Sequence, residues 1–110
     1  MGDKHALGEF EHHVLLSALR LGDNAYTTSI LAELEERTGR EVSPAAVYIA
    51  LRRLERSGSV RTKLRHGVER NERRERRYVQ VTPAGLRLAR QARQRLVRLW
   101  EGLSILASEP

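Results

Sequence analysis

The side chains in this sequence best suited to chemistry are arginines gathered in its central part. Arg52, Arg53 and Arg56 follow Tyr48 within one stretch at residues 43–58, SPAAVYIALRRLERSG. A guanidinium group binds a phosphate, or the O6 and N7 atoms of guanine, through two parallel hydrogen bonds. These residue types therefore favour recognition of a polyanion by charge and hydrogen bonding.

The net charge of +6 is distributed unevenly along the 110 residues. Residues 1–51 hold four basic and eight acidic side chains, residues 52–77 hold eleven and four, and residues 78–110 hold five and two. Eighteen of the twenty basic residues are arginine, which pairs bidentately and stacks. We therefore expect a polyanion as the partner rather than a small acidic molecule. The small, aromatic and basic side chains of the stretch at 43–58 suit double-stranded DNA. A solvated basic face is the simpler alternative, and a membrane-binding helix is disfavoured because the basic segment lacks a bulky apolar face.

Patterns typical of enzymes are absent from the sequence. Ser17, Ser43 and Ser57 have no histidine partner in a recognisable motif, and no phosphate-binding loop, dinucleotide fingerprint or H-E-x-x-H pattern occurs. His12 and His13 are adjacent, so on a helix they would point about 100° apart and could not chelate one metal ion. We therefore expect a protein that is not an enzyme, with no catalytic residues, no cofactor and no metal.

Composition and length also indicate in which compartment the protein acts and how large its core can be. Cysteine is absent, no apolar run approaches the roughly 20 residues that span a bilayer, and residues 1–21 lack the apolar core of a signal peptide. We expect a cytoplasmic protein with no membrane partner. A chain of this length has a modest core, which association with a second copy would extend.

The arginine-bearing stretch is predicted to be a helix with well-defined ends. Ser43 is suited to the N-cap, Pro44 to the first helical position and Gly58 to a left-handed stop. The spacing of Val47, Leu51 and Leu54 predicts a buried stripe. The residues expected on the remaining, outward surface are Ala45, Tyr48, Ile49, Arg52, Arg53 and Arg56.

Two helices are predicted before this one. Apolar residues at helical spacing run from Phe10 to Leu21, with an apolar sector wide enough to serve either as core or as part of a subunit interface. A second helix begins at Thr27 or Thr28 and ends at about Thr38. Because only a short turn separates it from the helix at 43–57, the two are expected to form a helix-turn-helix.

After Gly58 the period of the pattern changes from 3.6 to 2. Alternation over residues 60–65 and again over 76–81 predicts two strands of a hairpin. Arg70, Arg73 and Arg74 lie in the connecting loop. A basic hairpin beside a helix-turn-helix is typical of a wing, which contacts the minor groove or the sugar-phosphate backbone. A charged loop exposed to solvent is the alternative.

A last helix is predicted to begin at Thr82 and Pro83 and to carry a short heptad seam. The seam consists of Ala89, Ala92, Leu96, Leu99, Leu103 and Leu106. We expect it to form the interface of a homodimer, with the alternative that the helix folds back on its own domain. The residues assigned to this interface are Phe10, Leu96, Leu99, Trp100, Leu103 and Leu106.

These elements define the expected fold class: mainly α, with α+β character. The predicted organisation is a flexible tail at 1–8, a winged helix-turn-helix domain at 9–82 and a C-terminal dimerisation helix at 83–110. DNA contacts are expected from Ser43, Ala45, Tyr48, Arg52, Arg53, Arg56, Arg70, Arg73 and Arg74.

The residues also resemble the PadR family of bacterial transcriptional regulators. The matching stretches are LGEFEHHVLLSALRLGDNAYT at 7–27, LAELEERTGREVSPAAVYIALRRLERSGSV at 31–60 and RRYVQVTPAGLRLAR at 76–90. The sequence departs from the family pattern at Thr27, at Asn71-Glu72 and at Tyr78-Val79, where Gly, Gly-Gly and Tyr-Tyr are common. The resemblance implies a homodimeric repressor of a pseudo-palindromic operator, read by the helix at 43–57 and flanked by the wings.

The short C-terminal part resembles the small subfamily in which some members bind flat aromatic compounds at the dimer interface. That resemblance implies a possible small aromatic effector in contact with Trp100; the other interpretation of Trp100 is an anchor of the dimer interface. Two further functions remain alternatives to a sequence-specific regulator. One is an architectural protein that binds nucleic acid without sequence preference, and the other is a ligand- or protein-binding module with a vestigial helix-turn-helix.

Overall fold

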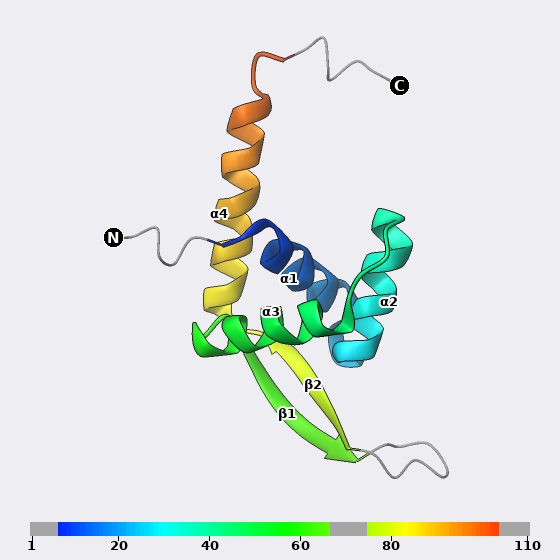
Figure 1. Cartoon of the computed structure of the whole chain (residues 1–110). Helices are drawn as coiled ribbons and strands as arrows, with labels where there is room; N and C mark the ends of the chain where they lie inside the picture. The colour runs from blue at the N-terminus through cyan, green and yellow to red at the C-terminus, as the bar shows by residue number, and fades with distance from the viewer. Residues whose placement is uncertain (1–6, 67–74, 104–110) are drawn as a thin grey trace.

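The computed structural model of the protein describes residues 7–66 and 75–103 and is shown in Figure 1. Its elements, in chain order, are α1 (Glu9–Leu21), the short 3-10 helix η2 (Gly22–Asn24), α2 (Thr27–Thr38), α3 (Pro44–Arg56), β1 (Val60–His66), β2 (Glu75–Val81) and α4 (Pro83–Trp100). The two strands form one antiparallel sheet. The predicted fold class, a mainly helical winged helix-turn-helix, is confirmed.

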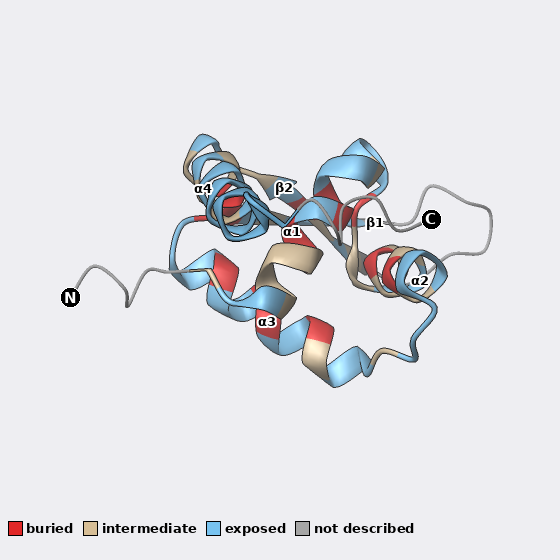
Figure 2. Ribbon diagram, turned by 90° about the horizontal axis from the view of Figure 1, so that it is seen from above, coloured by how far each residue is buried: buried red, intermediate tan, exposed pale blue. Residues whose placement is uncertain are grey.

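Helix α1 lies at the centre of the domain, and the other elements are arranged around it. It contacts α2, α3, α4 and β2, and its buried residues Val14, Leu15 and Ala18 belong to the hydrophobic core. In Figure 2 the buried positions of α2 and α3 face inward toward α1. Leu15, within the wide apolar sector predicted for this helix, is fully buried and so belongs to the core of its own domain.

Helix α3 has the ends that its sequence predicts. The Ser43 Oγ accepts a hydrogen bond from the Ala46 amide at 3.3 Å, and Pro44 occupies the first turn. Gly58 has a φ of 80°, in the left-handed region that glycine tolerates. Val47, Leu51 and Leu54 are buried as predicted, and Ala50 joins them. The helix is thus anchored along one stripe.

The acidic side chains of α2 stabilise the helix-turn-helix. The Val42 amide in the turn donates to Glu35 Oε2 at 2.9 Å, which fixes the path of the chain into α3. Glu33 Oε2 lies 2.6 Å from Arg37 Nε and 3.6 Å from Arg20 Nε, linking α2 to α1. These carboxylates therefore have structural partners.

The hairpin has two distinct faces, set by a register that pairs Val60 with Val81 and Lys63 with Tyr78. The face that we call the front face carries Val60, Thr62, Val79 and Val81 and packs toward α3. The opposite face, here the back face, carries Arg61, Lys63, Arg65, Tyr78 and Gln80. The Val79 amide also donates to the Ala25 carbonyl at 2.8 Å, which attaches the chain before α2 to the edge of β2. The loop residues Arg70, Arg73 and Arg74 lie outside the described residues.

The start of α4 packs directly on the turn between α3 and β1. The Thr82 hydroxyl donates to the Gly58 carbonyl at 2.6 Å and accepts from the Gly85 amide at 3.1 Å. The Ser59 carbonyl accepts from the Thr82 amide at 3.0 Å. A Cβ atom on Gly85 would lie 2.1 Å from that same carbonyl oxygen. Only glycine fits at this position.

The C-terminal helix differs from the expectation. Helix α4 ends at Trp100 and Gly102 adopts a φ of 82°, so Leu103 lies beyond the helix and does not continue the heptad seam. Leu106 lies outside the described residues. At the other end, Leu7, within the expected tail at 1–8, packs against the core, and the Gly8 amide donates to Glu11 Oε1 at 3.2 Å.

Replacing Gly85 with alanine should destabilise the protein by about 2–3 kcal/mol, because the new methyl group would overlap backbone that cannot move without separating α4 from the α3–β1 turn. Gly8→Ala is the matched control. Its added Cβ would meet only the flexible end of Glu11 at 3.4 Å, so a cost below about 1 kcal/mol is expected. Chemical denaturation followed by circular dichroism measures both, and equal costs would contradict the packing described.

The imidazole of His12 should make stability dependent on pH. Burial lowers the pKa of His12 from its ordinary value of 6.5, and the positive charges of His13 and Arg95 lower it further. The Nε2 atom is buried and has no hydrogen-bond partner among the described residues. The folded state disfavours the protonated His12 ring, so the unfolded chain binds more protons as pH falls. The stability that His12 contributes is therefore present above the pKa that His12 has in the unfolded chain, and it is lost as pH falls below that value.

The measurement is the Tm of wild type and of His12→Gln at about pH 8 and about pH 5.5, on either side of the ordinary histidine pKa. Wild type should lose more stability than the variant on acidification, while His13→Gln should retain most of the wild-type loss. An equal decrease in wild type and His12→Gln would show that other groups cause the pH dependence.

Candidate nucleic-acid interface

The outward face of α3 presents an unusual combination of exposed apolar and basic side chains. Tyr48 and Ile49 are 52% and 50% exposed although both are large and hydrophobic. Arg52 Nη1 donates to the Tyr48 hydroxyl at 2.9 Å, and its guanidinium carbon lies 5.7 Å from the centre of the Tyr48 ring. One turn of helix thus holds an arginine and a tyrosine together in solvent, before any partner is bound.

The other predicted contacts on α3 are exposed but differ in direction. Ser43 and Ala45 lie at the N-terminus of the helix, where the Ser43 Oγ serves as the cap. Arg56 is exposed in the last turn. Arg53 Nη1 lies 4.0 Å from Glu11 Oε2 of α1, so its side chain extends toward the neighbouring helix. Of the three arginines on α3, Arg52 is the one whose guanidinium contacts Tyr48.

A hydrogen-bonded chain connects α3 to the front face of the hairpin. Arg77 Nη1 donates to Thr62 Oγ1 at 2.9 Å, and Thr62 Oγ1 donates to Glu55 Oε2 at 2.8 Å. These residues line a hollow of about 380 Å³ that Tyr48 and Arg52 also border. The contact fixes the hairpin relative to α3. The sequence analysis missed it, because only the pairing register places Thr62 and Arg77 on one face.

Stacked aromatic and guanidinium groups fix the other edge of the hairpin. The rings of Tyr26 and Tyr78 meet edge to face, with centres 5.3 Å apart and an interplanar angle of 64°. Arg76 lies over Tyr26 at 4.4 Å and Arg65 lies over Tyr78 at 5.2 Å. Such pairs stabilise beyond simple burial. Residues Tyr26 and Tyr78 are 52 positions apart in the sequence, and no local pattern predicts their contact.

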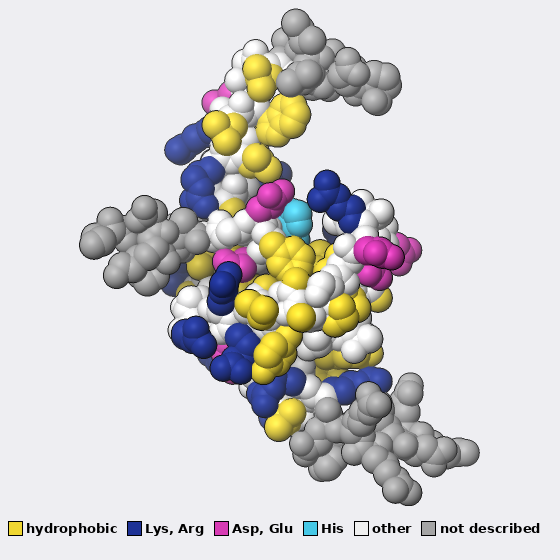
Figure 3. Space-filling model, in the orientation of Figure 1, with side chains coloured by type: hydrophobic (Ala, Val, Ile, Leu, Met, Phe, Trp, Pro, Cys, Tyr) yellow, Lys and Arg dark blue, Asp and Glu magenta, His cyan; other side chains and the backbone are white. Residues whose placement is uncertain are grey.

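The projecting part of α4 carries exposed apolar side chains next to its arginines. In Figure 3 hydrophobic atoms follow the projecting end of α4, where Lys and Arg also appear, and further Lys and Arg lie among hydrophobic atoms around α3 and the start of the hairpin. Leu96, Leu99 and Trp100 are 53%, 72% and 50% exposed, and Leu103 beyond the helix is exposed as well. Phe10, also assigned to a dimer interface, is partly buried against its own core.

None of the helices that the structure describes combines the length and the apolar character required to cross a membrane. Across 7–66 and 75–103, no group of three or more His, Cys, Asp or Glu side chains is arranged to hold a metal ion.

Comparisons with known proteins identify relatives of this arrangement. The profile of the transcriptional regulator PadR-like family matches residues 15–91. A PadR family regulator from Eggerthella lenta is 25% identical, with a TM-score of 0.67 over 88% of this chain and 82% of that one. A PadR-like regulator from Bacillus cereus shares the fold at 16% identity, with a TM-score of 0.68 over 92% and 93% of the two chains.

A transcriptional regulator from Clostridium thermocellum has the same fold at 19% identity. Its TM-score is 0.70, over 86% of this chain and 88% of that one. No curated protein matches the sequence.

Proposed function

Because the chain belongs to the PadR-like family of transcriptional regulators, we propose that it binds operator DNA as a homodimeric repressor. The observation that carries this proposal is the solvent face of α3, where Tyr48, Ile49 and Arg52 stand exposed on a helix that is otherwise anchored in the core. A regulator of chromosomal genes of this kind acts in the cytoplasm.

The proposed base-contacting surface of α3 runs from its N-terminus to Arg52. A helix of this size fits the major groove of B-form DNA, where small residues such as Ala45 let the backbone approach the bases. Ile49 can contact thymine methyl groups, and Arg52 can bind guanine or a phosphate. Exposed apolar side chains on a soluble domain commonly mark such contact surfaces. Ser43 is placed at the same end of the helix.

The proposed contacts with the DNA sugar-phosphate backbone come from the basic residues that flank this surface of α3. Arg56 extends the positive surface along α3, and Arg77 is held toward it by Thr62. Arg53 is proposed as a contact that must first leave Glu11, its neighbour in the unbound protein. The loop arginines Arg70, Arg73 and Arg74 remain predicted wing contacts. Contacts of this kind position a protein on DNA without reading its sequence.

The proposed dimer is formed through the second half of α4. Its first half is buried on its own domain at Gly85 and Ala89, but Leu96, Leu99 and Trp100 project into solvent. Three large apolar residues at helical spacing on an uncovered helix favour association with a second copy. Leu16 of α1 is a further exposed apolar side chain that could contact that copy.

Within this dimer Trp100 is proposed to anchor the interface. A second role, stacking against a flat aromatic effector bound between the two copies, is implied by the resemblance to the small subfamily, and the half-exposed ring is compatible with it. Quenching of tryptophan fluorescence by such a compound distinguishes the two roles, since Trp100 is the only tryptophan in the chain.

The DNA-binding proposal predicts that Tyr48→Ala and Arg52→Ala each weaken operator binding by about 1–3 kcal/mol while the protein stays folded. Arg90→Ala on α4 removes the same charge away from the proposed surface and should change the affinity little. Footprinting on the DNA upstream of the protein's own reading frame locates the site, and fluorescence anisotropy measures the affinities at physiological salt.

Random duplex DNA of the same length serves as the reference in this experiment. A specific regulator should prefer its operator by roughly 10³-fold or more. Equal affinity for the two duplexes would instead indicate an architectural protein, and equal losses in Arg52→Ala and Arg90→Ala would place the DNA on another surface.

The dimer proposal predicts that Leu96→Lys combined with Leu99→Lys yields monomers in sedimentation, because two charges per chain would have to be buried at the interface. Leu64→Lys is the matched control, since Leu64 is an exposed leucine on the hairpin and is expected to leave the dimer intact. A dimer that persists in the double variant would mean that the subunits associate elsewhere.

A further inference from the structure

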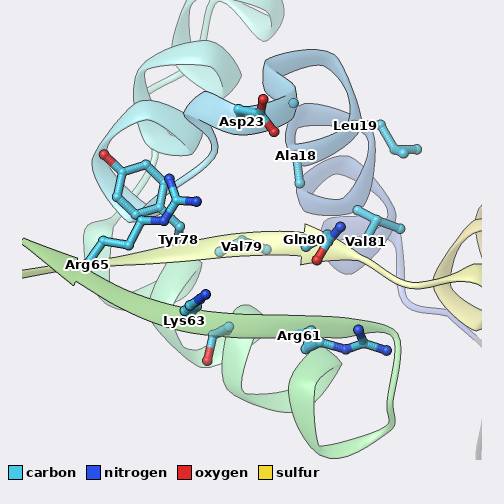
Figure 4. Close-up of a pocket in the computed structure, with 12 residues that line it drawn as sticks. Ala18, Leu19, Asp23, Arg61, Lys63, Arg65, Tyr78, Val79, Gln80 and Val81 are labelled. Carbon is cyan, nitrogen blue, oxygen red and sulfur yellow. The ribbon is translucent and has the colours of Figure 1, made fainter.

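A groove of about 570 Å³ lies on the back face of the hairpin, away from α3. Figure 4 shows its two walls: the strands form one, and the end of α1 with the following turn forms the other. The strand wall carries Arg61, Lys63 and Arg65, while the helical wall carries Leu19 and Asp23. The groove therefore has a cationic side and a mainly apolar side.

The three cations form a regular strip along β1. They alternate along β1, so successive members are about 6.7 Å apart and the strip spans about 13 Å. Within residues 7–66 and 75–103, Arg61 and Lys63 have no ion pair, and Arg65 contacts the Tyr78 ring at 5.2 Å. Asp23 contributes the single negative charge among the lining residues.

The size and charge of the groove limit its occupant. The groove volume of about 570 Å³ lies within the range of about 300–1,000 Å³ that is common for small-molecule sites. A DNA duplex instead needs an open protein surface of about 1,000–2,500 Å². One carboxylate would neutralise one cation of the strip and leave the others unpaired. A chain of phosphate groups matches three cations spaced along a strand, since arginine and lysine both bind phosphate oxygens.

We propose that this groove binds a nucleoside di- or triphosphate. Its phosphates would lie along Arg61, Lys63 and Arg65. Its flat base would lie against the wall formed by Leu19 and Ala18, which provides apolar contact. The Asp23 carboxylate, at the end of that wall, would accept a hydrogen bond from an amino group of the base or a ribose hydroxyl.

Occupation of the groove has a consequence for DNA binding that rests on the proposed function. A bound polyphosphate neutralises three cations of the hairpin and adds negative charge beside the wing. The affinity of the hairpin for the DNA backbone then falls, because that contact depends on positive charge. Nucleotide binding itself does not require that the protein bind DNA, so the two proposals can fail separately.

The test is a titration of the full-length protein with N-methylanthraniloyl-ATP, followed by competition with ATP, tripolyphosphate and adenosine. We expect ATP to compete best and adenosine worst. The Arg61→Ser, Lys63→Ser double variant should weaken binding at least tenfold. The matched control, Arg87→Ser with Arg90→Ser, removes two exposed charges from α4 and should keep the wild-type affinity.

Several results would overturn the inference. They are no binding to wild type at millimolar nucleotide, an equal loss in the two double variants, or tripolyphosphate competing as well as ATP. A fourth is displacement of the label by random duplex DNA as effectively as by ATP, which would make the strip a DNA contact. Operator binding measured on the same samples separates this outcome from failure of the proposed function: a protein that binds operator but no nucleotide contradicts the groove assignment alone.

Discussion

The contact between the start of α4 and the turn after α3 is the constraint on which the domain depends. The Ser59 carbonyl receives the Thr82 amide at 3.0 Å and the Thr82 hydroxyl at 3.1 Å, and Gly85 passes close enough to exclude any side chain. At this one point α3 ends, β1 begins, β2 ends and α4 begins. A shift here would therefore change the direction of the exposed face of α3, of the hairpin and of the projecting helix together.

Acidic and basic side chains have different roles in the domain. Glu33 and Glu35 of α2 hold α1 and the turn before α3, and Glu55 holds the hairpin through Thr62. These three carboxylates are thus engaged within the domain. Arg52 and the back-face cations have no carboxylate partner among the described residues, so the surface around α3 and the hairpin stays positive.

Much of the fold could be predicted because it depends on local chemistry. The caps at Ser43 and Thr82 and the turn glycine Gly58 need only their immediate neighbours, and each lies where it was expected. Contacts between distant segments could not be predicted in this way. The Tyr26–Tyr78 pair depends on the strand register. In α4 the helix ends at Trp100, although the heptad spacing of leucines continues beyond that residue.

Because the start of α4 is attached directly to the turn after α3, a tilt of α4 would move α3 with it. With 18 residues α4 is about 27 Å long, and no flexible linker separates its base from the end of α3. In a pair of chains joined at the far ends of these helices, a tilt of about 10° would displace each α3 by about 5 Å. A displacement of that size is enough to take two helices out of step with successive turns of a duplex. In the proposed dimer, small changes in how the helix ends pack against each other would therefore alter the proposed DNA binding by α3, at the other end of the helix.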